Sequence, residues 1–154
     1  MNRRLALLSS CLLLLTLTAC GGGSGDPARV QYAPALGVDL SVMQRSDSGL
    51  YTLEQTVGTG AEAVSGNTLK VNYSGWLPDG TLFDSSLNPG RTPFVFTLGQ
   101  GRVIQGWDEG LVGMRVGGKR RLILPSSLGY GANGTRGIPP DSVLVFDVQL
   151  LSVN

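Results

Sequence analysis

The sequence contains no histidine and has only two cysteines, Cys11 and Cys20, in 154 residues. Without histidine, the serine–histidine and cysteine–histidine pairs that activate a nucleophile cannot be built in their usual form. Zinc sites need imidazole or thiolate ligands, which are absent from the body of the chain. We therefore expect no metal and no other cofactor, and a function that requires no activated nucleophile.

Charged residues are also scarce, at 15% of the chain, and they nearly cancel to a formal net charge of +1. This balance gives no electrostatic reason to expect nucleic acid as a partner. The basic run 119–121 lies inside an expected strand and should divide between its two faces. After Gly99-Gln100-Gly101 the next glycine is Gly106, which comes two positions too late for a dinucleotide-binding loop. Asp108 and Glu109 are adjacent carboxylates that point apart on a helix, and we expect them to be solvated.

Residues 1–20 have the pattern of a bacterial export signal. Arg3 and Arg4 precede an apolar run over 5–17 that is too short to span a bilayer comfortably. The end of the run, Leu17-Thr18-Ala19-Cys20, resembles a lipobox and predicts a signal peptide over 1–19 with a lipid on Cys20. The alternative is an ordinary secretory signal cleaved near Ala19. With the lipid, we expect an extracytoplasmic protein anchored to a bacterial membrane, on its periplasmic or cell-surface side, by the lipid alone.

Residues 20–48 have the composition of a flexible linker. They begin with Gly21-Gly22-Gly23-Ser24-Gly25, and Pro27, Pro34 and Gly37 interrupt any regular element. As a free coil, such a segment would reach roughly 30 Å on average. An extra strand over 38–45 is the alternative, and the folded domain is expected over 49–154.

The domain is expected to be rich in turns and strands. Glycine accounts for 23 of 154 residues and proline for 8, which favours a β or α+β domain over a helical bundle. Alternating apolar residues predict a series of strands with one buried face. The expected strands cover residues 50–56, 69–74, 81–83, 94–98, 119–125 and 143–152.

One short helix is expected after the strand at 94–98. Ile104, Trp107, Leu111 and Met114 recur at spacings of three and four, which is the stripe of a helix that packs on one side. Glycines at 106, 110 and 113 flank this stripe, and each interior glycine costs a helix roughly 1 kcal/mol relative to alanine. The helix therefore needs a sheet to lie on, and its glycines allow a close approach. The predicted fold class is α+β, with an antiparallel sheet wrapped around one short helix.

Several motifs occur in the order and spacing typical of FKBP-type peptidyl-prolyl isomerases, and the chain resembles this family over about residues 49–152. The resemblance implies a strongly curved sheet around the helix and catalysis of rotation about X–Pro bonds. The motifs are Val71-Asn72-Tyr73-Ser74-Gly75, Asp79-Gly80-Thr81-Leu82-Phe83-Asp84-Ser85-Ser86, Val103-Ile104-Gln105-Gly106-Trp107-Asp108-Glu109-Gly110, Gly129-Tyr130-Gly131-Ala132, and Ile138-Pro139-Pro140 leading to Leu144-Val145-Phe146-Asp147-Val148.

Catalysis of rotation about an X–Pro bond requires no nucleophile, metal or nucleotide, so it is compatible with the residue types present in this chain. Its barrier of ~18–20 kcal/mol comes from amide resonance, and no bond has to break. The twisted transition state is less dipolar than the planar amide, so a dry aromatic pocket binds it better than the ground state. A hydroxyl or backbone donor that holds a substrate carbonyl completes the requirement.

The resemblance also implies roles for individual residues. Trp107 would form the floor of the pocket, and the Tyr130 hydroxyl would bind a substrate carbonyl. Asp84 would accept polar contacts at the edge, the Ile104 amide would be a backbone donor, and Ile138 would lie at the lip. Phe94 and Phe146 could instead serve the core alone. The implied walls are Tyr73, Phe83, Phe94, Phe96, Val103, Ile104 and Phe146, and the predicted catalytic set is Tyr73, Phe83, Asp84, Tyr130 and Phe146.

The expected partners are proline-containing polypeptides and macrolides of the rapamycin type. The loop at 133–140 is one residue shorter than is usual in the family, which leaves any specificity set by this loop open. We expect a monomer, because the long N-terminal helical segment of dimeric relatives is missing. Two other functions are considered: a non-catalytic chaperone module that grips proline-containing segments, and a scaffold that docks a membrane partner. Since few formal charges are expected near the pocket, Leu-Pro or Phe-Pro peptides should turn over faster than Glu-Pro peptides.

Overall fold

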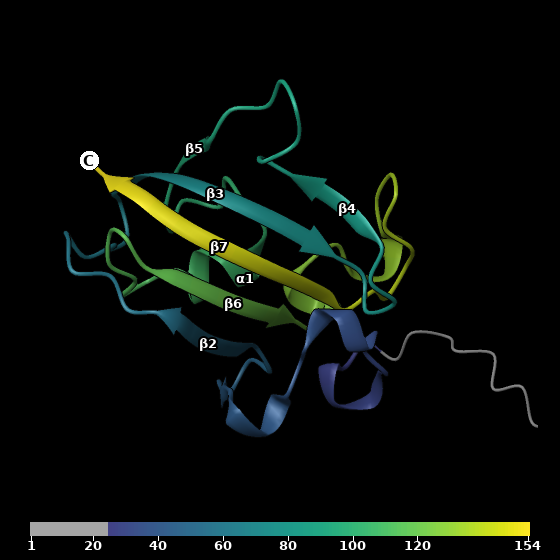
Figure 1. Ribbon diagram of the computed structural model, residues 1–154. Helices are drawn as coiled ribbons and strands as arrows, with labels where there is room; N and C mark the ends of the chain where they lie inside the picture. Colours follow the sequence, from purple (N-terminus) through teal and green to yellow (C-terminus); the bar gives the residue numbers. More distant parts are fainter. Residues whose placement is uncertain (1–24) are drawn as a thin grey trace, which may run out of the picture.

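The structure is a computed structural model that describes residues 25–154, shown in Figure 1. The predicted signal peptide and the predicted lipid on Cys20 lie outside the described residues. Between residues 25 and 154, no helix is both long enough and apolar enough to cross a membrane.

A seven-stranded antiparallel sheet forms the body of the domain, with strand order β1-β2-β6-β7-β3-β4 and with β5 paired to β3. The short helix α1, Gln105–Gly110, lies behind this sheet in Figure 1. The two longest strands, β3 and β7, pair from Leu69↔Val153 to Trp76↔Val145. The predicted α+β class is confirmed. The strands are β1 Gln44–Arg45, β2 Tyr51–Thr56, β3 Thr68–Trp76, β4 Leu82–Ser85, β5 Phe94–Thr97, β6 Lys119–Leu124 and β7 Leu144–Val153.

The main hydrophobic core lies between the sheet and α1. The predicted helix stripe is buried there: Trp107 is 4% exposed, Leu111 0% and Met114 2%. The glycines act as predicted, since a Cβ on Gly106 would lie 2.3 Å from the Leu124 Cδ2 and one on Gly110 would lie 2.9 Å from the Leu122 Cδ2. The helix ends at Gly110, well before Met114, and the chain then turns through Gly113, which takes a positive φ of 77°.

Residues 25–48, which we call the strap, pack against one end of the opposite face of the sheet. The strap contains the 3₁₀ helices η1 (Pro27–Arg29), η2 (Pro34–Leu36) and η3 (Leu40–Val42) and then the strand β1. It buries Leu36 and Met43 in a second hydrophobic cluster with residues of β2, β6 and the start of β7. The part of the linker prediction that falls on residues 25–48 is therefore wrong, because its apolar side chains find a partner surface on the sheet. The alternative of a strand over 38–45 holds only for Gln44–Arg45.

The strap is held by polar contacts as well as by its apolar side chains. The Arg121 guanidinium pairs with Asp147 through Nε–Oδ1 at 2.7 Å and Nη2–Oδ2 at 2.9 Å. Its remaining nitrogen, Nη1, donates to the Leu36 carbonyl at 2.5 Å. Two backbone bonds add to this, from Ala33 N to the Pro78 carbonyl at 2.8 Å and from Ser126 N to the Gly25 carbonyl at 2.9 Å. The strap is thus an integral part of the fold.

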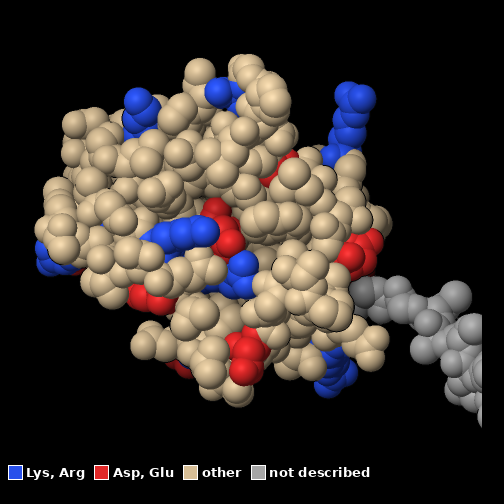
Figure 2. All heavy atoms as spheres, in the orientation of Figure 1, with Lys and Arg blue, Asp and Glu red and all other residues tan. Residues whose placement is uncertain are grey.

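The basic run divides between the two faces of β6, as predicted. Arg121 serves the strap, whereas Arg120 donates from Nη1 to the carbonyls of Gly110 at 2.6 Å and Val112 at 3.0 Å, on the helix side. Figure 2 shows charged residues of both signs scattered over the face that carries β7, with blue and red spheres side by side near its centre. This face shows no large patch of a single sign.

Glu109 is exposed and Asp108 is partly exposed, as predicted, but both carboxylates also hold other segments of the protein. Asp108 accepts hydrogen bonds from Gly99 N at 2.7 Å and from Gly101 N at 2.9 Å. Glu109 accepts from the hydroxyls of Ser46 and Ser48 at 2.8 and 2.6 Å. Each carboxylate therefore fixes a segment that is distant in the fold from the other.

Candidate functional site

A hollow of about 570 Å³ opens on the helix side of the sheet, between β3, β4, β5 and the start of α1. It combines a wall of aromatic rings with a small polar edge. Its lining residues are Tyr73, Phe83, Asp84, Arg91, Phe94, Gly101, Arg102, Val103, Ile104, Trp107, Tyr130 and Phe146.

Trp107 forms the floor of the hollow and is surrounded by other rings. Its ring centroid lies 5.2 Å from that of Tyr73 and 5.4 Å from that of Phe146, with interplanar angles of 81° and 82°. Edge-to-face pairs of this kind are favourable aromatic contacts. The indole Nε1 is buried and has no hydrogen-bond partner among the described residues. The Trp107 indole is surrounded by aromatic rings, and the faces of these rings are only weak hydrogen-bond acceptors.

Gly75 allows two rings to close over β3. Phe83 and Phe146 meet edge to face, with centroids 5.5 Å apart and an interplanar angle of 87°. A Cβ at Gly75 would lie 2.6 Å from the Phe83 Cζ and 2.7 Å from the Phe146 Cε1. Any side chain here would push these rings apart, so the wall of the hollow depends on glycine at this position.

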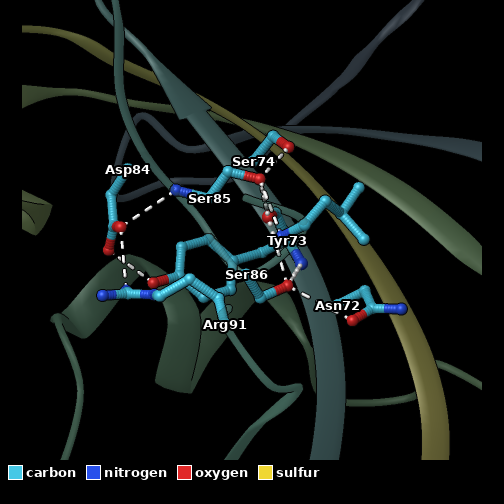
Figure 3. Close-up of polar contacts among 8 residues, drawn as sticks. Asn72, Tyr73, Ser74, Asp84, Ser85, Ser86 and Arg91 are labelled. Atoms are coloured by element: carbon cyan, nitrogen blue, oxygen red, sulfur yellow. Dashed lines mark hydrogen bonds and ion pairs between the residues drawn. The ribbon is translucent and has the colours of Figure 1, made fainter. Parts of the chain in front are cut away.

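The polar edge is built by the pairing of β3 with β4, shown in Figure 3. The register places Gly75 opposite Asp84 and Ser74 opposite Ser85. The hydroxyls of Ser74 and Ser85 are bonded to each other at 2.8 Å, and Tyr73 N donates to the Ser86 hydroxyl at 2.9 Å. These bonds fix the two strands next to the hollow.

Asp84 is already occupied by contacts from the protein. Its Oδ2 accepts from the Tyr73 hydroxyl at 2.5 Å, and its Oδ1 accepts from Arg91 Nη2 at 3.0 Å and from Ser85 N at 2.9 Å. Burial and then the bond to Asp84 raise the pKa of Tyr73 to about 12, so this hydroxyl stays protonated at neutral pH. Asp84 therefore holds the edge of the hollow together.

Two other donors at the hollow have no hydrogen-bond partner among residues 25–154. The Tyr130 side chain is 38% exposed, and its hydroxyl bonds to nothing else in residues 25–154. Burial and the nearby Asp84 charge raise the pKa of Tyr130, which keeps the hydroxyl available as a donor. The amide of Ile104 likewise donates to no group in the described part of the chain. The site can thus receive two acceptor oxygens.

All the residues predicted for the pocket except Phe96 and Ile138 line the hollow. Phe96 is 6% exposed and stacks behind Phe94, with centroids 5.5 Å apart. Ile138 is 5% exposed, because Thr135 and Ile138 exchange two backbone bonds of 2.9 Å that turn this segment back onto the core. The structure therefore places Phe96 behind the wall and Ile138 in the core, whereas the resemblance implied a wall and a lip.

Phe94 and Phe146 both contribute to the hollow. Phe94 is 40% exposed beside it, and Phe146 is 3% exposed and forms part of both the core and the lining. The alternative that they serve the core alone does not agree with this placement.

Arg91, Gly101 and Arg102 line the hollow but were missed by the sequence reasoning. The expectation of few formal charges near the pocket is therefore wrong, since Asp84, Arg91 and Arg102 all border it. A signal was available, because Arg102 directly precedes Val103 and Arg91 closely precedes Phe94. Among the described residues, no group of three or more acidic, histidine or cysteine side chains lies close enough to hold a metal ion.

Comparison with known proteins agrees with this geometry. A sequence profile of FKBP-type peptidyl-prolyl cis-trans isomerases matches residues 60–151. The chain is 54% identical over 106 residues to an FK506-binding protein of Neisseria meningitidis serogroup B, covering 68% of this chain and 96% of that protein. It is 45% identical over 145 residues to FK506-binding protein 2 of Dictyostelium discoideum, covering 94% of this chain and 96% of that protein.

Solved structures show the same likeness. The crystal structure of AtFKBP13 superposes with a TM-score of 0.68 at 42% identity, covering 73% of this chain and 98% of that one. The crystal structure of FkpA from Escherichia coli superposes with a TM-score of 0.69 at 40% identity, covering 79% of this chain and 55% of that one. With its matched sequence, its curved sheet around one helix and its aromatic hollow, the chain belongs to the family of FKBP-type peptidyl-prolyl cis-trans isomerases.

Proposed function

We propose that this isomerase acts on X–Pro bonds of exported polypeptides and that it does so in the aromatic hollow without covalent chemistry. The observation that carries the mechanism is the position of two donors, the Tyr130 hydroxyl and the Ile104 amide, which have no partner in the described part of the chain and lie beside a wall of rings. The rings exclude water from the proline, and the donors hold carbonyl oxygens of the bound chain.

The rate enhancement comes from the difference between the planar and the twisted amide. The planar amide is the more dipolar form, so it loses more solvation than the twisted form when water is excluded. The hollow over Trp107 therefore binds the twisted form better, which lowers a barrier of ~18–20 kcal/mol. The bonds from Tyr130 and Ile104 restrict the chain on one side of the bond while the other side rotates.

The test is the isomerisation of a short Leu-Pro peptide, followed by exchange NMR. We expect catalysis well above the spontaneous rate, which corresponds to tens of seconds or longer. A protein that binds the peptide but leaves its exchange rate unchanged would support the other candidate, a non-catalytic chaperone module that grips proline-containing segments.

Macrolides of the rapamycin type are proposed ligands of the same hollow. This proposal is supported by relatives that are named FK506-binding proteins and by the rings around Trp107. Rapamycin should compete with the Leu-Pro peptide and abolish turnover at saturation. Turnover that persists when rapamycin is bound would place the reaction elsewhere on the protein.

We further propose a monomer anchored through a lipid on Cys20 at the periplasmic or cell-surface side of a bacterial membrane. The lipobox supports the anchor, and the packing of the strap on the sheet within one chain supports the monomer. Since the strap begins at Gly25, residues 20–25 can separate the domain from the lipid by at most about 18 Å. The active domain would then work close to the membrane surface.

Replacing the lipidated residue tests the anchor. A Cys20→Ser variant should lose the diacylglycerol mass and leave the membrane fraction or remain unprocessed, with intact mass and fractionation as the measurements. A variant that still carries the diacylglycerol would contradict the proposal. Sedimentation velocity of the purified domain checks the monomer.

A further inference from the structure

Arg102 lies between the aromatic hollow and a second hollow of about 440 Å³. The second hollow is lined by Gly66, Thr97, Gln100, Gly101 and Arg102, so its side chains are polar and it holds no aromatic ring. Gly101 and Arg102 belong to both hollows. A polypeptide that places its proline over Trp107 can therefore extend a neighbouring side chain past Arg102.

The charge of Arg102 is not neutralised by contact with any described residue. Its side chain is exposed and takes part in none of the ion pairs found in residues 25–154. Two carboxylates of this region, Asp84 at the aromatic hollow and Asp108 on α1, are engaged elsewhere. Asp84 pairs with Arg91, and Asp108 accepts the amides of Gly99 and Gly101. A cation without a partner thus borders a hollow that binds polypeptide.

Deepening the proposed function, we infer that Arg102 makes the isomerase favour clients that carry an aspartate or glutamate next to the proline. The carboxylate enters the second hollow, where it meets the guanidinium of Arg102, and the side chains of Gln100 and Thr97 supply further polar contacts. The guanidinium presents a planar fork of donors that matches a carboxylate. Arg102 is a specificity residue in this scheme, since it touches the flanking residue and leaves the rotating bond to Trp107 and Tyr130.

The effect is limited by solvent. An exposed ion pair between Arg102 and the substrate stabilises the bound state only slightly. The charge should therefore change kcat/KM by only about 1.5- to 5-fold. The preference should weaken with salt, since the Debye length falls from about 10 Å at 0.1 M to about 3 Å at 1 M. Comparing glutamate with glutamine isolates this charge, because the two side chains have nearly the same size.

The experiment measures kcat/KM for pairs of short peptides that differ only in glutamate or glutamine, placed directly before or directly after the proline. The Glu/Gln ratio is kcat/KM for the glutamate peptide divided by kcat/KM for the matching glutamine peptide. It is determined for the wild type, Arg102→Gln and Arg102→Glu, at low and high salt. A ratio within one variant cancels any general loss of folded enzyme. Lys70→Gln is the matched control, since Lys70 is exposed on β3 and lines neither hollow.

We expect at least one pair whose Glu/Gln ratio falls about 1.5- to 5-fold in Arg102→Gln and further in Arg102→Glu, with Lys70→Gln unchanged. The same ratio in wild type and Arg102→Gln for both placements would overturn the inference. An equal fall in Lys70→Gln would also overturn it, because the overall charge would then be responsible. Absence of catalysis with every peptide would contradict the proposed function instead, so the two failures are distinct.

Discussion

Replacing Tyr130 by phenylalanine should affect catalysis and leave the fold intact. In the described part of the chain, the Tyr130 hydroxyl makes no hydrogen bond, and the side chain is 38% exposed. Its removal therefore strands no buried partner. We expect the free energy of unfolding to change by less than about 0.5 kcal/mol, as for surface substitutions away from special features.

The catalytic effect follows from the loss of one bond to a substrate carbonyl. A neutral hydrogen bond contributes about 0.5–1.5 kcal/mol. Since 1.36 kcal/mol corresponds to tenfold in rate, kcat/KM should fall by roughly 2- to 13-fold. Phe83→Ala should cause a larger fall, because it opens the wall shared with Phe146 and admits water to the planar amide.

Tyr73→Phe is the matched comparison, since it also removes one hydroxyl beside the same hollow. The Tyr73 hydroxyl donates to Asp84 at 2.5 Å, so its loss leaves a carboxylate with one donor fewer. Hydrogen bonds to charged groups contribute about 1.5–3 kcal/mol, and partial exposure favours the lower end of this range. Tyr73→Phe should therefore lower stability, in contrast to Tyr130→Phe.

Both variants are compared by urea unfolding and by kcat/KM on a Leu-Pro peptide. An unchanged kcat/KM in Tyr130→Phe would refute the role of its hydroxyl. A fall in kcat/KM accompanied by an equal loss of stability would refute the separation of the two roles.

Three further predictions concern stability and pH. Trp107→Ala removes a side chain that is 4% exposed and should cost about 3–5 kcal/mol in urea unfolding, whereas a loss below about 1 kcal/mol would contradict its place as the floor. Arg121→Met removes the largely buried main partner of Asp147, which keeps only Gln55 at 3.2 Å and Lys119 at 4.0 Å, and should cost about 3 kcal/mol, with recovery in the double variant Arg121→Met/Asp147→Leu; no recovery would argue against the pair. The raised pKa values of Tyr73 and Tyr130 mean that the folded state holds both protons more tightly, so the stability they contribute is present below about pH 10 and is lost as pH rises through each raised pKa, which is about 12 for Tyr73. Urea midpoints and kcat/KM should stay flat from pH 6 to 9, and an ionisation that changes either near pH 8 would contradict this.

Several features could be predicted because their signals are local. The strands at 69–74 and 143–152 follow from alternation, and the stripe of Trp107 and Leu111 follows from helical spacing. The family motifs located most of the hollow. They could not show that Phe96 lies behind Phe94 or that Ile138 turns into the core, since both depend on how β5 and the segment at 135–138 are bent in space.

The chain by itself determined which surfaces must meet and which chemistry is excluded. Residue type and period alone account for three features, each with a direct physical consequence: the absence of histidine, the alternation along the strands at 69–74 and 143–152, and the glycines at 106 and 110. Only the tertiary structure decided where residues 25–48 lie. Arg121 joins Asp147, 26 positions away, and the Leu36 carbonyl, 85 positions away. Contacts over such separations leave no periodic pattern in the sequence. A segment rich in glycine and proline therefore resembled a linker until the sheet provided the surface on which it packs.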